Sequence, residues 1–201
     1  MIKKKIAVFV SGGGTNLGAL IKAQQIGELK SGEIAVVISN NKSAYALVRA
    51  KDALIPSEIV LKSEEGSQEN FEKKIISILD KYQIDVIVLA GFMTILSSDF
   101  TKKYDERIIN VHPSLIPSFC GKGYYGLKVH EEALKKGVKV TGATVHFVNE
   151  IPDGGKIIMQ KAVAVKDGDT PEKLQKRVMR LAEWVILPRA VEKVCADLQG
   201  E

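Results

Sequence analysis

The chain has 201 residues, of which 45% are hydrophobic and 26% charged, with a formal net charge of +5 at pH 7. This composition is typical of a soluble globular protein, and it predicts one domain over residues 1–201 with no apolar run long enough for a membrane helix. Two cysteines and three histidines, scattered along the chain, argue against a disulfide framework and a structural metal site.

Apolar strand-like runs alternate with helical patterns along most of the chain. We predict strands at 5–10, 33–39, 57–61, 85–90 and 108–111, and helices at 16–26, 44–53, 68–82, 99–104 and 127–137. Two more strands, 141–148 and 156–165, lie close enough together for an antiparallel hairpin. The pattern predicts an α/β protein with a mostly parallel sheet, helices on both faces and an antiparallel C-terminal hairpin.

The last helix has clear start signals and one internal breaker. Thr170 is expected as its N-cap and Pro171 as its first residue, and Pro188 should kink or divide it. The N-terminus is basic and then apolar, and it lacks the cleavage site of a signal peptide. We interpret it as the first strand of a cytoplasmic protein.

The glycine-rich sequence SGGGTN joins the first predicted strand to the first helix. Backbone N–H groups at such a turn, together with the helix dipole, suit a phosphate group. No Gly-Lys-Ser/Thr follows, and Leu17 occupies the third glycine position of a dinucleotide fingerprint, so neither of those motifs is present. The alternative is a tight turn without a ligand.

The sequence NVHPSLIP brings an amide and an imidazole to the end of the fifth strand. Asn110 and His112 are two residues apart and therefore share one face of a strand. Pro113 keeps His112 extended, and Pro117 fixes a second bend for which a cis Ile116–Pro117 bond is expected. Such a pair of donors suits a developing oxyanion; the alternative is a histidine with a structural role.

An acid–base imidazole needs a carboxylate to orient it, and Asp153 in the sequence NEIPDGG is the candidate. The hairpin would have to pack beside the fifth strand, and the alternative is a plain turn. Thr144 and His146 alternate on the preceding strand, and we expect a supporting role for His146. The sequence LAGFMTIL after the fourth strand offers an apolar slot or simply core, and Cys120 carries no sign of activation.

Five segments in this order resemble one enzyme family: SGGGTN, LAGFM, NVHPSLIP, TGATVHFVNEIPDGGKIIMQ and a late Glu-Trp-x-x-x-Pro segment. The chain resembles the phosphoribosylglycinamide formyltransferases of the formyl-folate transferase and hydrolase family over nearly its whole length. The resemblance implies a Rossmann-like fold and transfer of the formyl group of 10-formyltetrahydrofolate to glycinamide ribonucleotide in purine biosynthesis. It implies small-molecule substrates, no metal, no nucleic acid, no membrane, and a monomer or homodimer.

The resemblance also implies roles for individual residues. Asn110, His112 and Asp153 match the catalytic trio, and Asn110 also matches the folate site. The positions matching the ribonucleotide site are Gly14, Thr15, Asn16 and Glu183. The positions matching the folate site are Gln68, Met93, Thr94, Ile95 and Leu96. Thr94 and Gln68 stand where relatives carry arginine.

Three alternatives are weighed against this interpretation. A formyltetrahydrofolate deformylase shares the trio but uses water as its nucleophile and usually adds an N-terminal domain. A methionyl-tRNA formyltransferase shares the His-Pro-Ser-Leu-x-Pro run but carries a C-terminal RNA-binding domain. A nucleotide-binding regulatory module would use only the glycine loop and would leave Asn110, His112 and Asp153 without a role.

Overall fold

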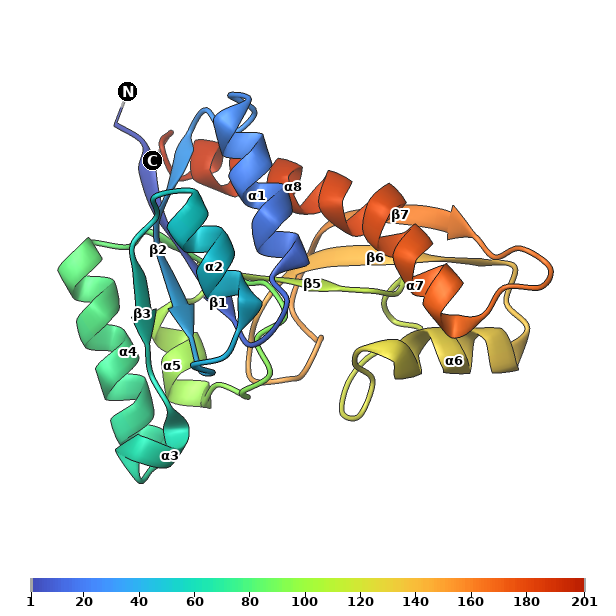
Figure 1. Cartoon of the computed structure of the whole chain (residues 1–201), viewed down its shortest axis with the longest axis horizontal. Coiled ribbons are helices and arrows are strands. Elements are labelled where there is room, and N and C mark those ends of the chain that lie inside the picture. The colour runs from blue at the N-terminus through green and yellow to red at the C-terminus, as the bar shows by residue number, and fades with distance from the viewer. Residues whose placement is uncertain (1, 201) are drawn as a thin grey trace.

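The structure, a computed structural model, describes residues 2–200. Its elements follow the predicted alternation of strands and helices (Figure 1). The strands are β1 (Lys4–Val10), β2 (Gly32–Ser39), β3 (Ser57–Ile59), β4 (Val86–Leu89), β5 (Ile108–His112), β6 (Val140–Phe147) and β7 (Ile157–Ala164). The helices are α1 (Thr15–Gln25), α2 (Tyr45–Asp52), α3 (Lys62–Glu65), α4 (Gln68–Tyr82), α5 (Ser98–Lys103), α6 (Leu127–Lys136), α7 (Pro171–Val178), the π-helical η1 (Met179–Glu183) and α8 (Trp184–Asp197).

The seven strands form one sheet in the order β3-β2-β1-β4-β5-β6-β7. β1 to β5 are parallel to one another, whereas β6 is antiparallel to both β5 and β7. The predicted fold class is therefore confirmed: a mostly parallel, Rossmann-like sheet with an antiparallel hairpin at its C-terminal side. Because β1 lies between β2 and β4, the chain reverses its direction across the sheet at this point, where α/β proteins bind ligands.

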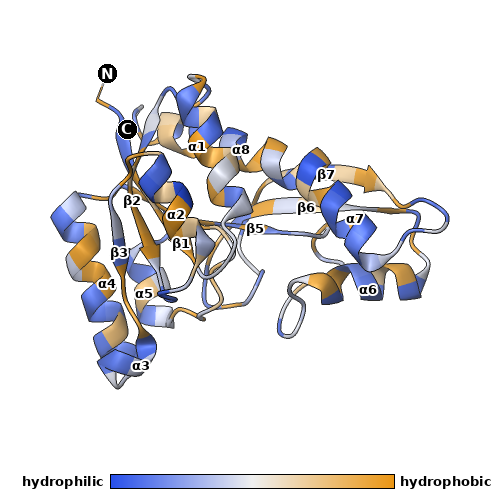
Figure 2. Ribbon diagram, viewed as in Figure 1, coloured by the Kyte–Doolittle hydropathy of each residue, from blue (hydrophilic) through white to orange (hydrophobic). Residues whose placement is uncertain are grey.

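The sheet is buried on both faces, and alternate residues of β1 show how. Ile6, Val8 and Val10 face a core shared with α1, α2 and α8, whereas Ala7 and Phe9 face a second core shared with α4 and α5. All five are fully buried. Hydrophobic residues accordingly fill the central strands while the helices carry polar outer faces (Figure 2).

The C-terminal helix is interrupted, but not at Pro188 as predicted. A π turn at Met179–Glu183 separates α7 from α8, and Pro188 lies inside α8. Pro188 lacks an N–H and its ring crowds the carbonyl of Trp184, which is the first residue after the π turn. The π turn η1, which ends just before Trp184, thus accommodates the distortion that Pro188 causes in the helix.

Smaller differences concern element boundaries. The first helix starts at Thr15 instead of Asn16, β3 is shorter than predicted, and the short α3 was not predicted. Among the helices of residues 2–200, none combines the length and apolar character needed to cross a bilayer. The Ile116–Pro117 bond is cis, as expected.

Candidate active site

The glycine loop leaves the carboxyl end of β1 and opens α1. Gly14 precedes the helix with φ 66°, and no side chain caps the first turn. A Cβ on Gly14 would lie 2.6 Å from that of Ala46, so only glycine fits at this approach to α2. The N–H groups of the first helical turn therefore remain available to an anion.

A buried amide–carboxylate pair lies beside this loop. Asn16 Nδ2 donates to Glu183 Oε2 at 2.8 Å, which joins the start of α1 to the π turn η1. Both residues are buried. Burial raises the pKa of Glu183, and the hydrogen bond from Asn16 only partly opposes that rise. Asn16 Oδ1 has no partner within residues 2–200, so the pair retains an acceptor for a hydroxyl or amine.

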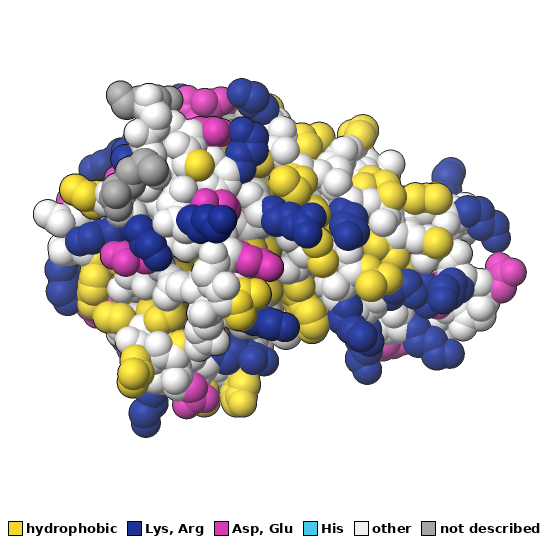
Figure 3. Space-filling model, turned by 90° about the horizontal axis from the view of Figure 1, so that it is seen from above, with side chains coloured by type: hydrophobic (Ala, Val, Ile, Leu, Met, Phe, Trp, Pro, Cys, Tyr) yellow, Lys and Arg dark blue, Asp and Glu magenta, His cyan; other side chains and the backbone are white. Residues whose placement is uncertain are grey.

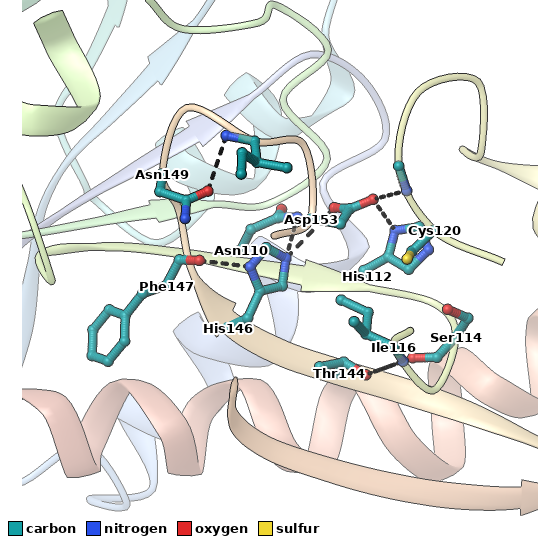
Figure 4. A network of polar contacts seen from close by, with 12 residues as sticks. Asn110, His112, Ser114, Ile116, Cys120, Thr144, His146, Phe147, Asn149 and Asp153 are labelled. Carbon is teal, nitrogen blue, oxygen red and sulfur yellow. Dashed lines mark hydrogen bonds and ion pairs between the residues drawn. The ribbon is translucent and has the colours of Figure 1, made fainter. Parts of the chain in front are cut away.

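Strand β5 carries Asn110 and His112 on one face, as the alternation predicts. Asp153 reaches them from the loop between β6 and β7, and its Oδ2 lies 3.4 Å from His112 Nδ1 (Figure 4). The structure therefore brings together an amide, an imidazole and a carboxylate that are 43 residues apart at most in the chain. Asp153 has φ 57°, a left-handed conformation that Asp tolerates better than most residues.

Both ring nitrogens of His112 face acceptors. Nδ1 faces Asp153, and Nε2 donates to the carbonyl of Phe119 at 2.8 Å. Burial lowers the pKa of His112, while the Asp153 charge and the Phe119 carbonyl act in the opposite direction. His112 as a whole is only 4% exposed. In this state, therefore, the segment around Phe119 covers the histidine and occupies its Nε2 donor.

Asp153 is held as a carboxylate. Burial opposes its ionisation, but His146, the charge of His112 and the N–H of Gly121 together lower the pKa of Asp153 below its ordinary value. The Gly121 N–H donates to Asp153 Oδ2 at 2.8 Å. The acid is thus ionised at neutral pH and contacts both the β5 histidine and the Phe119–Gly121 segment.

His146 on β6 contacts two members of the trio. Its Nδ1 donates to the carbonyl of Phe147 at 2.7 Å, and its Nε2 lies 3.2 Å from Asn110 Nδ2. The same Nε2 lies 3.5 Å from Asp153 Oδ1. His146 therefore orients the amide and borders the carboxylate, whereas the sequence showed only its alternation with Thr144.

Thr144, the cross-strand partner of His112, contacts the turn that follows β5. Its Oγ1 donates to the carbonyl of Ser114 at 2.7 Å and accepts from the Ile116 N–H at 3.1 Å. Ser114 Oγ in turn donates to the carbonyl of Ser118 at 2.6 Å. These bonds hold the turn between the two prolines, so the strand end that carries His112 is fixed from β6 as well as by Pro113.

A pocket of about 130 Å³ adjoins the trio. Asn110, His146 and Asp153 line it, whereas His112 does not. The predicted residues Thr94, Ile95 and Leu96, from the loop after β4, also line the pocket. Met93 does not line this pocket and is 58% exposed at the surface.

Three hydrogen bonds tie the loop after β4 to its surroundings. Met93 N–H donates to Ser11 Oγ at 2.9 Å, which joins this loop to the glycine loop. Asn40 Nδ2 donates to Thr94 Oγ1 at 2.7 Å. Gln68 lies outside the pocket on α4, from which its Nε2 donates to the Ile95 carbonyl at 3.1 Å. Ser11 and Asn40 each follow the end of a strand, but their positions in the sequence do not predict these hydrogen bonds.

Cys120 lies close to the trio without the features of a nucleophile. Burial and the negative charge of Asp153 both raise the pKa of its thiol. Its Sγ contacts the Pro117 carbonyl at 3.3 Å. A raised pKa disfavours the thiolate, which is the reactive form. In the described part of the chain, no group of three or more His, Cys, Asp or Glu residues is arranged to hold a metal ion.

This fold and this cluster define an α/β enzyme with an amide–imidazole–carboxylate centre at the carboxyl edge of its sheet, beside a loop suited to an anion. The formyl transferase family model matches residues 4–191. The chain belongs to the formyl transferase family.

Similar proteins carry related names. The chain is 43% identical over 194 residues to the human trifunctional purine biosynthetic protein adenosine-3, covering 96% of this chain and 18% of that protein. It is 41% identical to phosphoribosylglycinamide formyltransferase of Haemophilus influenzae, covering 94% of this chain and 86% of that protein. The chain thus spans less than a fifth of the human relative.

Solved structures agree with this placement. A phosphoribosylglycinamide formyltransferase from Coxiella burnetii has a TM-score of 0.88 and 41% identity, over 98% of this chain and 89% of that one. A formyltetrahydrofolate deformylase from Pseudomonas syringae has a TM-score of 0.83 and 32% identity, over 98% of this chain but 62% of that one. The same fold therefore occurs in a hydrolase.

Proposed function

We propose that this protein transfers the formyl group of 10-formyltetrahydrofolate to the amine of glycinamide ribonucleotide, a step of purine biosynthesis. The observation that supports this proposal is the contact of Asp153 with His112, which shares one strand face with Asn110, at the same carboxyl edge of the parallel strands as the glycine loop. The names of the similar proteins support the same reaction. The folate is a cosubstrate, and we infer no metal in the reaction.

The trio acts on the formyl carbon in this account. The amine nitrogen attacks that carbon, and the resulting oxyanion is stabilised by hydrogen bonds from Asn110 and His112. The carbon–N10 bond then breaks, the nitrogen that attacked loses a proton, and N10 of the folate gains one. Asp153 orients His112 and balances the charge that the imidazole acquires during these proton transfers.

Because Phe119 contacts His112, the loop that carries Phe119 has to move during the proposed reaction. Nε2 of His112 is occupied by the Phe119 carbonyl, and His112 does not line the pocket. For this nitrogen to serve the oxyanion, the carbonyl has to move away when substrates bind. The hydrogen bond from the Gly121 N–H to Asp153 would change at the same time, because Phe119 and Gly121 belong to the same short segment.

The ribonucleotide fits the glycine loop and the buried pair behind it. Its phosphate is bound by backbone N–H groups at Gly14, Thr15 and Asn16, where α1 begins. Glu183, held by Asn16, accepts from a hydroxyl or the amine of the ribonucleotide. In this proposal the amine of the ribonucleotide points from the glycine loop towards the trio.

The folate occupies the pocket beside the trio, with Thr94, Ile95, Leu96 and Asn110 in its wall. A volume of about 130 Å³ is below the roughly 300 Å³ that ligand sites usually offer, so the pocket widens on binding. Exposed Ile95 in its wall, and exposed Met93 two residues earlier in the same loop, are available to cover the ligand. Gln68 acts on the folate through the Ile95 carbonyl and the loop.

We further infer a cytoplasmic monomer or homodimer that acts on small molecules and binds neither nucleic acid nor membrane. The small-molecule substrates and the monomer or homodimer follow from the family resemblance, and the rest follows from the composition and from the absence of a basic, aromatic-rich segment in the sequence.

One assay separates the transferase from the deformylase. Purified protein is mixed with 10-formyltetrahydrofolate, with or without glycinamide ribonucleotide, and tetrahydrofolate formation is followed by absorbance. We expect product only when the ribonucleotide is present. Equal product without ribonucleotide would identify a hydrolase and refute the proposal, and no product under either condition would refute both.

A further inference from the structure

A larger hollow lies apart from the trio, on the face of the molecule that carries α1 and α8. It has a volume of about 570 Å³, and we call it the α1–α8 groove. Side chains that define its character are Lys22, Ile26, Arg49, Arg180, Trp184 and Arg189. On this face, Lys and Arg side chains lie interspersed with hydrophobic ones (Figure 3).

The charge of the groove is strongly one-sided. Four cationic side chains line it, against one carboxylate, Glu28. Within residues 2–200, none of the four forms an ion pair within 4 Å, although eleven ion pairs occur elsewhere on the molecule. Cations grouped around a concave surface without acid partners attract anions and hold them by charge-assisted hydrogen bonds.

One of these cations is already fixed in position. Arg49 Nε donates to the Gly13 carbonyl at 2.9 Å, and its guanidinium lies 5.1 Å from the centre of the Tyr45 ring. Because the side chain is held at two points, little conformational entropy remains to be lost when its other N–H groups bind an anion.

The remaining surface of the groove is apolar. Trp184 is 36% exposed and Ile26 is 60% exposed, and both line the groove together with small residues of α1. A part-exposed indole beside cationic side chains provides a flat surface on which a planar ring can stack. A simple inorganic anion would leave this apolar surface unused.

The groove extends well beyond the phosphate loop. Thr15 lines one end and Ile26 lines the other, and eleven residues of helix span about 16 Å. Lys22 and Arg189 line the groove as well, from α1 and α8. A ligand held by them therefore occupies space that the phosphate cradle at Gly14–Asn16 does not use.

We propose that the α1–α8 groove binds a second ligand of the nucleotide class, a planar ring that carries phosphate, separate from the substrate ribonucleotide. The volume falls within the range of about 300–1,000 Å³ of small-molecule sites. The ring stacks on Trp184, and the phosphate is held by Lys22 and Arg189, towards the end of the groove away from the Gly14–Asn16 cradle. This site lies outside the trio and does not depend on the proposed reaction.

The only tryptophan of the chain lies in the groove, which provides a local probe. Adenosine 5′-monophosphate is titrated while Trp184 fluorescence is recorded with excitation at wavelengths that adenine does not absorb. The titration is repeated with saturating glycinamide ribonucleotide, with adenosine and with inorganic phosphate. We expect a saturable change with the nucleotide, unaffected by the ribonucleotide, and much weaker responses to adenosine or phosphate alone.

Charge-removing variants then locate the binding. Lys22→Gln and Arg189→Gln should each weaken nucleotide binding at least about fivefold. Lys193→Gln, one turn further along α8 and paired with Asp197 outside the groove, serves as the matched control and should bind as the unchanged protein does. Absence of a fluorescence change, equal binding by all variants, or displacement by the ribonucleotide would each overturn the proposal.

Discussion

At the scale of single residues, His112 is fixed by partners from two separate loops. Asp153 approaches Nδ1 from the β6–β7 connection, and Phe119 accepts from Nε2. An imidazole oriented in this way can gain or lose a proton without changing its position. The two partners differ in their proposed roles. The Asp153 carboxylate takes part in the proposed reaction, whereas the Phe119 carbonyl has to move away from Nε2 before that nitrogen can bind the oxyanion.

Removal of the imidazole tests its place in the reaction. We expect His112→Ala to lower kcat by about 10²–10³-fold, the usual effect of losing one oxyanion donor. Ribonucleotide affinity, measured by titration calorimetry, should stay within about threefold because the glycine loop is untouched. A variant with nearly unchanged kcat would exclude His112 from catalysis.

Removal of the charge on Asp153 tests the carboxylate. Asp153→Asn retains a side chain that tolerates φ 57°, so the protein should stay folded while kcat falls by roughly 10²-fold. Asp167→Asn, at an exposed turn, is the matched control and should leave kcat unchanged. Full activity in a folded Asp153→Asn protein would return this residue to a role in the turn alone.

At the scale of elements, the π turn η1 carries an acid into the site while α8 continues the helix. Glu183 is 6% exposed and contacts Asn16 at the start of α1. A carboxylate buried in this way weakens the fold when it ionises, because burial raises its pKa. If Glu183 binds the ribonucleotide as proposed, the helix keeps this acid at the expense of stability.

Glu183→Gln should reveal this cost. The folded-state pKa of Glu183 is raised, so the wild-type protein loses stability as pH rises above the ordinary carboxyl range, and the neutral amide does not. At pH 8 we expect a gain on the order of 1 kcal/mol, or about 2–4 °C in Tm, together with weaker ribonucleotide binding. Calorimetric melting at pH 5 and pH 8 measures it, and a destabilised variant at pH 8 would contradict the account.

Helix α6 contains a different buried group, His130. Neither ring nitrogen has a hydrogen-bond partner within residues 2–200, and the side chain is fully buried. Burial, with a smaller effect of His112, lowers the pKa of His130 from 6.5 to about 4. The neutral ring is therefore the form that the fold accommodates.

Acid should accordingly destabilise the protein through α6. A depressed histidine pKa contributes stability that is present above pH 6.5 and is lost as pH falls towards 4, a difference of roughly 3 kcal/mol. Urea unfolding at pH 7 and at pH 4.5 should show a clearly smaller loss for His130→Leu than for the wild-type protein. Equal losses in the two proteins would show that His130 does not titrate in this way.

At the scale of the whole molecule, the sequence patterns predict the sheet and the trio but not the contacts that loops make. Strand–helix alternation predicts the parallel sheet, and the spacing of Asn110 and His112 predicts their common face. The approach of Asp153 needed only the hairpin to pack beside β5, which the antiparallel β5–β6 pairing provides.

Other features of the molecule depend on tertiary structure alone. The Phe119 carbonyl and the Gly121 N–H are backbone groups, so residue types carry no sign of their contacts with the trio. No sequence pattern predicts the π turn that positions Glu183. Because Pro188 is a helix breaker, the interruption was predicted at Pro188 and not at Met179–Glu183. The α1–α8 groove is assembled from α1, α2, η1 and α8, so it combines the first and the last helices of the chain.

The fate of the formyl group tests the central claim most directly. The protein is incubated with 10-formyltetrahydrofolate labelled with ¹³C in the formyl group and with glycinamide ribonucleotide, and the products are resolved by mass spectrometry. The account predicts that the label appears on the ribonucleotide amine in amounts equal to the tetrahydrofolate formed, and that Asp153→Asn abolishes most of it. Recovery of the label as formate, with unmodified ribonucleotide, would contradict it.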